Sequence, residues 1–161
     1  MIRRVSFSYL LAILLTILIP SWLARAQIDP DITIILSSDS ISFYVYGPPG
    51  RFDAQQAVEV DVRCGYEDWT LSCEVSSLKG EHGEIPGSRI FMSSLFTDPD
   101  IDQGAGPGYE ALDEPRLVAR GSFTGPLAIK VGTVKFRLLT IWEDRPGTYT
   151  GVIRFTYLVK P

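Results

Sequence analysis

The clearest evidence for the fold comes from residues 58–64, Val58-Glu59-Val60-Asp61-Val62-Arg63-Cys64. Apolar and charged residues alternate along it, which is the period of a strand with one buried and one solvated face. A second alternating stretch, Trp69-Thr70-Leu71-Ser72-Cys73-Glu74-Val75, follows after a short gap. Helical periodicity is hard to find beyond residue 26. The chain is therefore expected to be all-β, with Trp69 in the core, where large aromatic side chains contribute most of the packing energy.

The same alternation recurs on both sides of this pair of segments. We expect further strands at 32–36, 41–45, 89–96, 117–123, 127–142 and 149–159. Turn-forming residues separate the segments, as in Gly47-Pro48-Pro49-Gly50 and Arg145-Pro146-Gly147. Strands of this length and spacing predict an antiparallel immunoglobulin-like β-sandwich, with a β-barrel as the alternative.

The long segment 127–142 carries an irregularity at Gly132. The apolar phase changes there, and a glycine at a phase change predicts a bulge or a turn. The side chains expected to point inward are Leu127, Ile129 and Val131 before the glycine, and Val134, Phe136 and Leu138 after it.

Residues 1–26 have the pattern of an export signal. Two arginines precede an apolar run, Val5–Ile19, and Ala24 and Ala26 occupy the small-residue positions of a cleavage site. The run is shorter than the roughly 20 apolar residues that a membrane span needs. We therefore expect a cleaved signal helix over 1–26 and one β-sandwich domain over 27–161. That domain is expected to be extracytoplasmic, whether periplasmic, on the cell surface or secreted.

The charge of the remaining chain excludes some partners. Of the 15 basic side chains, Arg3, Arg4 and Arg25 leave with the signal, so 12 face 19 acidic ones and the net charge is −7. Nucleic acids and anionic membranes both require a basic surface. We expect binding to neither of them, and no second apolar segment predicts a membrane anchor after cleavage.

Cys64 and Cys73 are the only cysteines. In an oxidising compartment such a pair is expected to form a disulfide. A tight hairpin at 65–68 would place Cys73 too far along its strand, because a bridge needs Cα atoms within about 7 Å. Either the connection is wider, or the two strands lie in opposite sheets.

The segment 97–115 is long and acidic. Asp98, Asp100 and Asp102 alternate as the ligands of calcium loops do. However, Gln103 stands where such a loop has its turn glycine, and Tyr109 stands where it has a bidentate glutamate. The interpretations are a solvated acidic loop, a calcium site at these three aspartates, or a contact surface for a partner, because loops of this length are often functional.

Catalytic motifs are missing from the sequence. His82 is the only histidine and lies on a glycine-rich turn, so any Ser–His–Asp arrangement would have to use it. No phosphate-binding loop, dinucleotide fingerprint or H-E-x-x-H motif is present. We therefore expect a protein that is not an enzyme and that needs no cofactor, calcium being the one alternative.

Aromatic residues form the other candidate site. Tyr44 and Tyr46 fall on the face opposite the apolar residues of their strand, and Tyr66 falls in the turn after Cys64. Such side chains stack on sugars or anchor a protein partner when they are exposed. The alternative is that a neighbouring loop covers them.

The C-terminal stretch Trp142-Glu143-Asp144-Arg145-Pro146-Gly147-Thr148-Tyr149-Thr150-Gly151, followed by 152–159, resembles the closing hairpin of bacterial secreted surface subunits, including fimbrial and spore-coat-type subunits. In fimbrial subunits a strand from the next subunit completes the sandwich. This chain departs from that pattern, because it has enough strands to complete its own fold. The resemblance implies a surface or assembly subunit that self-associates or binds other proteins. The alternative function is a carbohydrate- or ligand-binding module.

Overall fold

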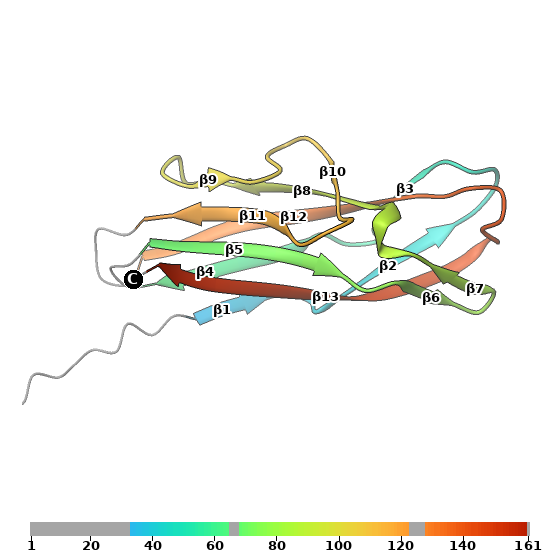
Figure 1. Ribbon diagram of the computed structural model, residues 1–161, viewed down its shortest axis with the longest axis horizontal. Coiled ribbons are helices and arrows are strands. Elements are labelled where there is room, and N and C mark those ends of the chain that lie inside the picture. Colours follow the sequence, from blue (N-terminus) through green and yellow to red (C-terminus); the bar gives the residue numbers. More distant parts are fainter. Residues whose placement is uncertain (1–32, 65–67, 123–127, 161) are drawn as a thin grey trace, which may run out of the picture.

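The computed structural model describes residues 33–64, 68–122 and 128–160, which form two antiparallel β-sheets stacked in a sandwich (Figure 1). The first sheet has the strand order β1-β4-β12-β8-β10, and β3 also pairs with β12. Its strands are β1 (Thr33–Leu36), β3 (Arg51–Asp53), β4 (Val58–Cys64), β8 (Ile90–Phe96), β10 (Glu110–Ala111) and β12 (Ala128–Leu139).

The second sheet has the order β7-β6-β13-β5-β11-β9, and β2 pairs with the other edge of β13. Its strands are β2 (Ser40–Val45), β5 (Asp68–Val75), β6 (Leu78–Gly80), β7 (Gly83–Ile85), β9 (Asp102–Gln103), β11 (Arg116–Gly121) and β13 (Gly147–Lys160). A single 3-10 turn, η1 (Gly87–Arg89), precedes β8. The expected signal helix lies outside the described residues.

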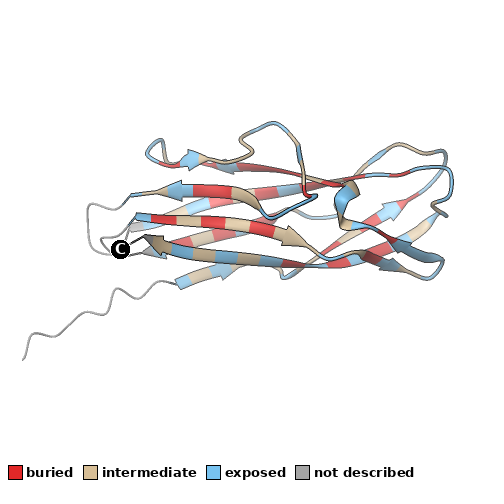
Figure 2. Ribbon diagram, viewed as in Figure 1, coloured by how far each residue is buried: buried red, intermediate tan, exposed pale blue. Residues whose placement is uncertain are grey.

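The core lies between the two sheets and follows the predicted alternation (Figure 2). Val58, Val60 and Val62 of β4 are fully buried, and Trp69 and Leu71 of β5 are buried in the other sheet. The all-β class and the strand at 58–64 are thus confirmed. The strands divide into two separate sheets, so the barrel alternative is wrong.

The predicted phase change at Gly132 is wrong. The pairing of β12 with β4 runs without a shift across the glycine, and Ile129 and Val131 point outward with 50% and 47% of their surface exposed. Gly132 itself faces inward, where the ring of Phe96 on β8 occupies the space of a side chain. The glycine therefore makes room for an aromatic ring in an unbroken strand.

The acidic segment 97–115 closes one side of the sandwich. Its β9 extends the edge of the second sheet and its β10 extends the edge of the first sheet. Ile101 and Leu112 insert into the core, and backbone bonds join Gly104 to Val118 (3.1 Å) and Ser94 to Gly106 (2.9 Å). The segment is therefore an ordered seam between the two sheets.

Candidate interaction surfaces

Two of the three predicted tyrosines form an exposed aromatic pair. Tyr44 and Tyr46 are 57% and 64% exposed, and their ring centroids lie 5.8 Å apart. Tyr46 also meets the edge of Phe52 on β3 at 5.4 Å. The alternative that a loop covers these tyrosines is wrong. Tyr66 lies outside the described residues.

Trp142 lies at the same end of the sandwich, in the turn between β12 and β13, and is 82% exposed. The alternation of 127–142 placed it at the end of a strand, so the sequence analysis missed it. The sequence did contain a sign of its exposure. The turn-forming residues Asp144, Pro146 and Gly147 follow closely, so a tryptophan beside them is expected to lie outside the alternating part of the strand. We call Tyr44, Tyr46 and Trp142 the aromatic tip.

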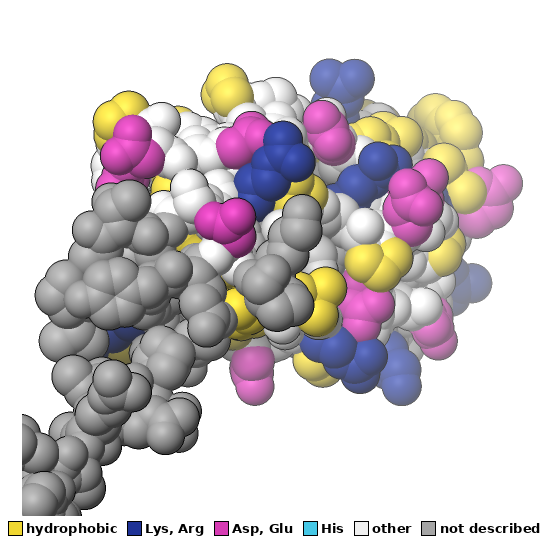
Figure 3. Space-filling model, turned by 60° about the vertical axis from the view of Figure 1, so that its left-hand side comes forward, with side chains coloured by type: hydrophobic (Ala, Val, Ile, Leu, Met, Phe, Trp, Pro, Cys, Tyr) yellow, Lys and Arg dark blue, Asp and Glu magenta, His cyan; other side chains and the backbone are white. Residues whose placement is uncertain are grey.

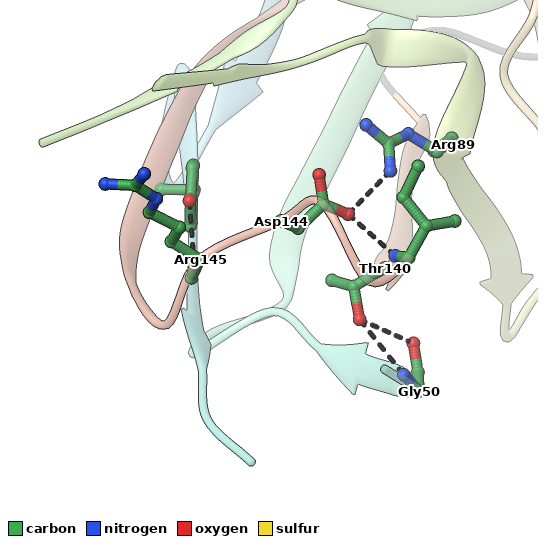
Figure 4. A network of polar contacts seen from close by, with 7 residues as sticks. Gly50, Arg89, Thr140, Asp144 and Arg145 are labelled. Atoms are coloured by element: carbon green, nitrogen blue, oxygen red, sulfur yellow. Dashed lines mark hydrogen bonds and ion pairs between the residues drawn. The ribbon is translucent and has the colours of Figure 1, made fainter. Parts of the chain in front are cut away.

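A network of polar contacts holds the turn that carries Trp142 (Figure 4). The buried carboxylate of Asp144 accepts a hydrogen bond from the Ile141 backbone N–H at 2.7 Å and an ion-paired one from Arg89 at 2.6 Å. The Thr140 hydroxyl accepts from the Gly50 N–H at 3.0 Å and so ties the two loops of this end together. Trp142 is thus exposed on a well-supported turn, which lowers the ordering cost of binding.

The three predicted calcium ligands do not converge. Asp98 forms an ion pair with Lys130 and accepts from the Asp100 N–H at 2.9 Å; the hydrogen bond from Lys130 is the main cause of a lowered Asp98 pKa. Asp102 accepts from Arg120 at 2.6 Å. Within the described ranges no three His, Cys, Asp or Glu side chains are grouped so that they could hold a metal ion.

The strands that carry the two cysteines, β4 and β5, lie in opposite sheets, which is one of the two arrangements that the sequence analysis gave for a bridge. Cys73 lies in β5, where it pairs with Phe155 of β13. It is five residues beyond Asp68, the first residue of β5, which corresponds to roughly 17 Å along the strand at about 3.3 Å per residue. It is a free, buried cysteine, so the expected Cys64–Cys73 disulfide is not formed. Burial, with a smaller contribution from Glu74, raises the pKa of the Cys73 thiol to about 12. The side chain of Cys64 lies outside the described residues.

The edge of β13 is the feature that sequence analysis did not anticipate. β2 covers one edge of this strand only as far as Val152, and the Ile153 N–H still donates to Asp39 there at 2.8 Å. Beyond Ile153, no described strand pairs with that edge, while the opposite edge continues its pairing with β5 to Lys160. Within the described residues the sandwich therefore has one closed side, at 97–115, and one partly open side, at β1 and β13. Figure 3 shows that acidic and basic side chains are interspersed on the face that it presents.

Other findings bear on catalysis and on membranes. His82, which any Ser–His–Asp arrangement would need, is exposed in the turn between β6 and β7. None of the helical structure in the described part of the chain is long or apolar enough for a membrane span.

No protein-family model, curated protein or solved structure matches this chain.

Proposed function

We propose that the chain is an exported, non-enzymatic immunoglobulin-like β-sandwich that works as a surface or assembly subunit and binds other proteins, including its own copies. Export is supported by the pattern of residues 1–26. The immunoglobulin-like type is supported by residues 33–45. They pair with the first sheet as β1 and then cross to the second sheet as β2. The single observation that carries the binding role is the edge of β13 beyond Ile153, with which no described strand pairs.

The direction of the backbone groups along β13 follows from two hydrogen bonds. The Ile153 N–H points to the β2 side, whereas the Val152 C=O accepts from the Ser76 N–H on the opposite side at 3.0 Å. Backbone groups alternate in direction along a strand. Phe155 and Val159 therefore direct their N–H and C=O groups toward the side on which no described strand pairs with β13, and such an edge is a template for an added strand.

The side chains beside this edge favour an apolar partner strand. Phe155 and Tyr157 of β13 face inward but are only half-buried, and so are Ile34 and Leu36 of the neighbouring edge strand β1. A strand that pairs with β13 and places apolar residues at alternate positions would complete their burial. Burial of apolar surface is favourable by about 25 cal/mol per Å², so backbone pairing and burial would act together.

Light scattering on the purified protein across a concentration series tests this proposal. We expect a mass that rises with concentration, and a Val159→Pro variant that weakens association by about tenfold because it removes one N–H from the open edge. Val159→Ala is the matched control, since it loses the same side chain but keeps the N–H. A strict monomer with no strand-forming partner, or equal effects of both variants, would contradict strand addition.

The aromatic tip favours the alternative function, a carbohydrate-binding module. Exposed, well-held aromatic rings are suitable platforms for sugars, and Trp142 would report binding directly. A soluble glucan that shifts the tryptophan emission of the wild-type protein, but not that of Trp142→Ala, would support this alternative. Trp69 is buried in both proteins and provides the constant background.

A further inference from the structure

A small cavity lies on the outer face of the first sheet, near the end that carries the aromatic tip. Its volume is about 150 Å³, and it is lined by Arg51, Phe91, Tyr109, Arg137 and Leu139. Strand register brings four of these together, because Arg137 pairs with Phe91 and Leu139 pairs with Arg51. Tyr109, from the segment that closes the sandwich, lies against Arg137 with 4.0 Å between its ring centroid and the guanidinium carbon.

The cavity is positively charged on a protein whose overall charge is negative. Arg137 donates to Asp53 from Nε at 2.6 Å and from Nη2 at 3.2 Å, and this hydrogen bonding, together with the charges of Arg137 and Lys135, lowers the pKa of Asp53. The guanidinium of Arg51 has no ion-pair partner among the described residues. The cavity is thus lined by two cations, of which Arg137 is paired with Asp53.

The other walls of the cavity are apolar. Phe91, Leu139 and the ring of Tyr109 offer flat or aliphatic surface beside the two guanidinium groups. A cavity of about 150 Å³ holds one six-membered aromatic ring. Guanidinium groups bind carboxylates in a planar, bidentate way and also stack on aromatic rings.

We propose that this cavity binds small planar carboxylates, in which a carboxylate is attached to a single six-membered ring. Arg51 holds the carboxylate, Arg137 adds its charge, and the ring lies against Phe91, Leu139 and Tyr109. The cavity belongs to the first sheet, whereas the open edge of β13 belongs to the second. Binding here is independent of the proposed assembly function, and either can fail alone.

Titration of the purified, ¹⁵N-labelled protein with sodium benzoate, at constant ionic strength, tests the proposal. We expect saturable shifts at the residues that line the cavity, with a Kd of about 1 mM, as is reasonable for a ligand of this size. Acetate, which lacks the ring, and benzyl alcohol, which lacks the charge, should bind at least about tenfold more weakly.

Two arginine variants complete the experiment. Arg51→Gln should weaken benzoate binding by about tenfold or more, whereas Arg63→Gln, an exposed arginine on the same face of the sheet but outside the cavity, should leave it unchanged. The amide spectrum of each variant shows whether it is folded. Absence of saturation up to about 20 mM benzoate, or equal weakening by both variants, would overturn the proposal.

Discussion

Gly132 lacks a side chain because its neighbour needs the space. A Cβ added there would lie 2.5 Å from the ring of Phe96, which is closer than any real contact of this kind. We expect Gly132→Ala to lower the free energy of unfolding by about 1–3 kcal/mol, since overpacking forces a rigid ring to move. Urea denaturation measures this effect. Gly108→Ala is the control, because its nearest atom is the Ala105 carbonyl oxygen at 3.8 Å, and an equal loss of stability in both variants would contradict the explanation.

Cys73 is expected to be chemically silent in the folded protein. Thiol reagents attack the thiolate, and burial raises the pKa of Cys73 to about 12, so the thiol stays protonated through neutral and mildly alkaline pH. In a Cys64→Ser variant, we expect iodoacetamide to label Cys73 at pH 8 only as fast as the protein unfolds, and at the rate of a free thiol in urea. Mass spectrometry of timed samples measures both rates. Fast labelling of the native variant would show that Cys73 is accessible.

At the scale of the elements, the turn between β12 and β13 depends on one carboxylate. Asp144 accepts from a backbone N–H and pairs with Arg89, and its side chain is only 6% exposed. Asp144→Ala should destabilise the protein by about 2–4 kcal/mol, because it leaves a half-buried guanidinium and a backbone N–H without their acceptor. Thermal unfolding checks this value. The exposed neighbour Glu143 supplies the control, and Glu143→Ala should change stability by less than about 0.5 kcal/mol.

The long strands were predictable and the short ones were not. β4, β5 and β13 each carry enough alternating residues for their buried face to be read from the sequence alone. β3, β6, β7, β9 and β10 have two or three residues each, too few for a period, and their pairing is set by the strands beside them. The acidic segment is the clearest case, because Ile101 and Leu112 reveal its role as a seam only once both sheets are in place.

The candidate interaction surfaces also divide into features that the sequence predicts and features that it does not. The exposure of Tyr44 and Tyr46 followed from their place opposite the apolar face of one strand. The edge of β13 with which no described strand pairs did not follow from the sequence, because the order of all the strands in a sheet decides which edges lie outermost. The disulfide was misjudged for a related reason, since spacing in the sequence does not say how far apart two cysteines lie across a sandwich.

For the molecule as a whole, the contrast between its closed and open sides predicts a pattern of hydrogen exchange. In dilute solution, where association is minimal, the even-numbered amides from Arg154 to Leu158 should be protected by β5. The amides of Phe155 and Val159 face the side on which no described strand pairs with β13, and they should exchange on the order of 100-fold faster. On the closed side, the amides of Ser94 and Gly104 donate to backbone carbonyls and should be slow at every concentration.

Raising the protein concentration then separates strand addition from other modes of contact. If copies associate through β13, the amides of Phe155 and Val159 gain protection, while the amides of the closed side keep the protection they had. Association through the aromatic tip would instead leave the alternation in β13 intact, since Tyr44, Tyr46 and Trp142 present side chains rather than free backbone groups. Exchange measured by NMR at two concentrations decides between them. Uniform protection of β13 in the dilute sample would show that this edge is already covered, and would remove the basis of the assembly proposal.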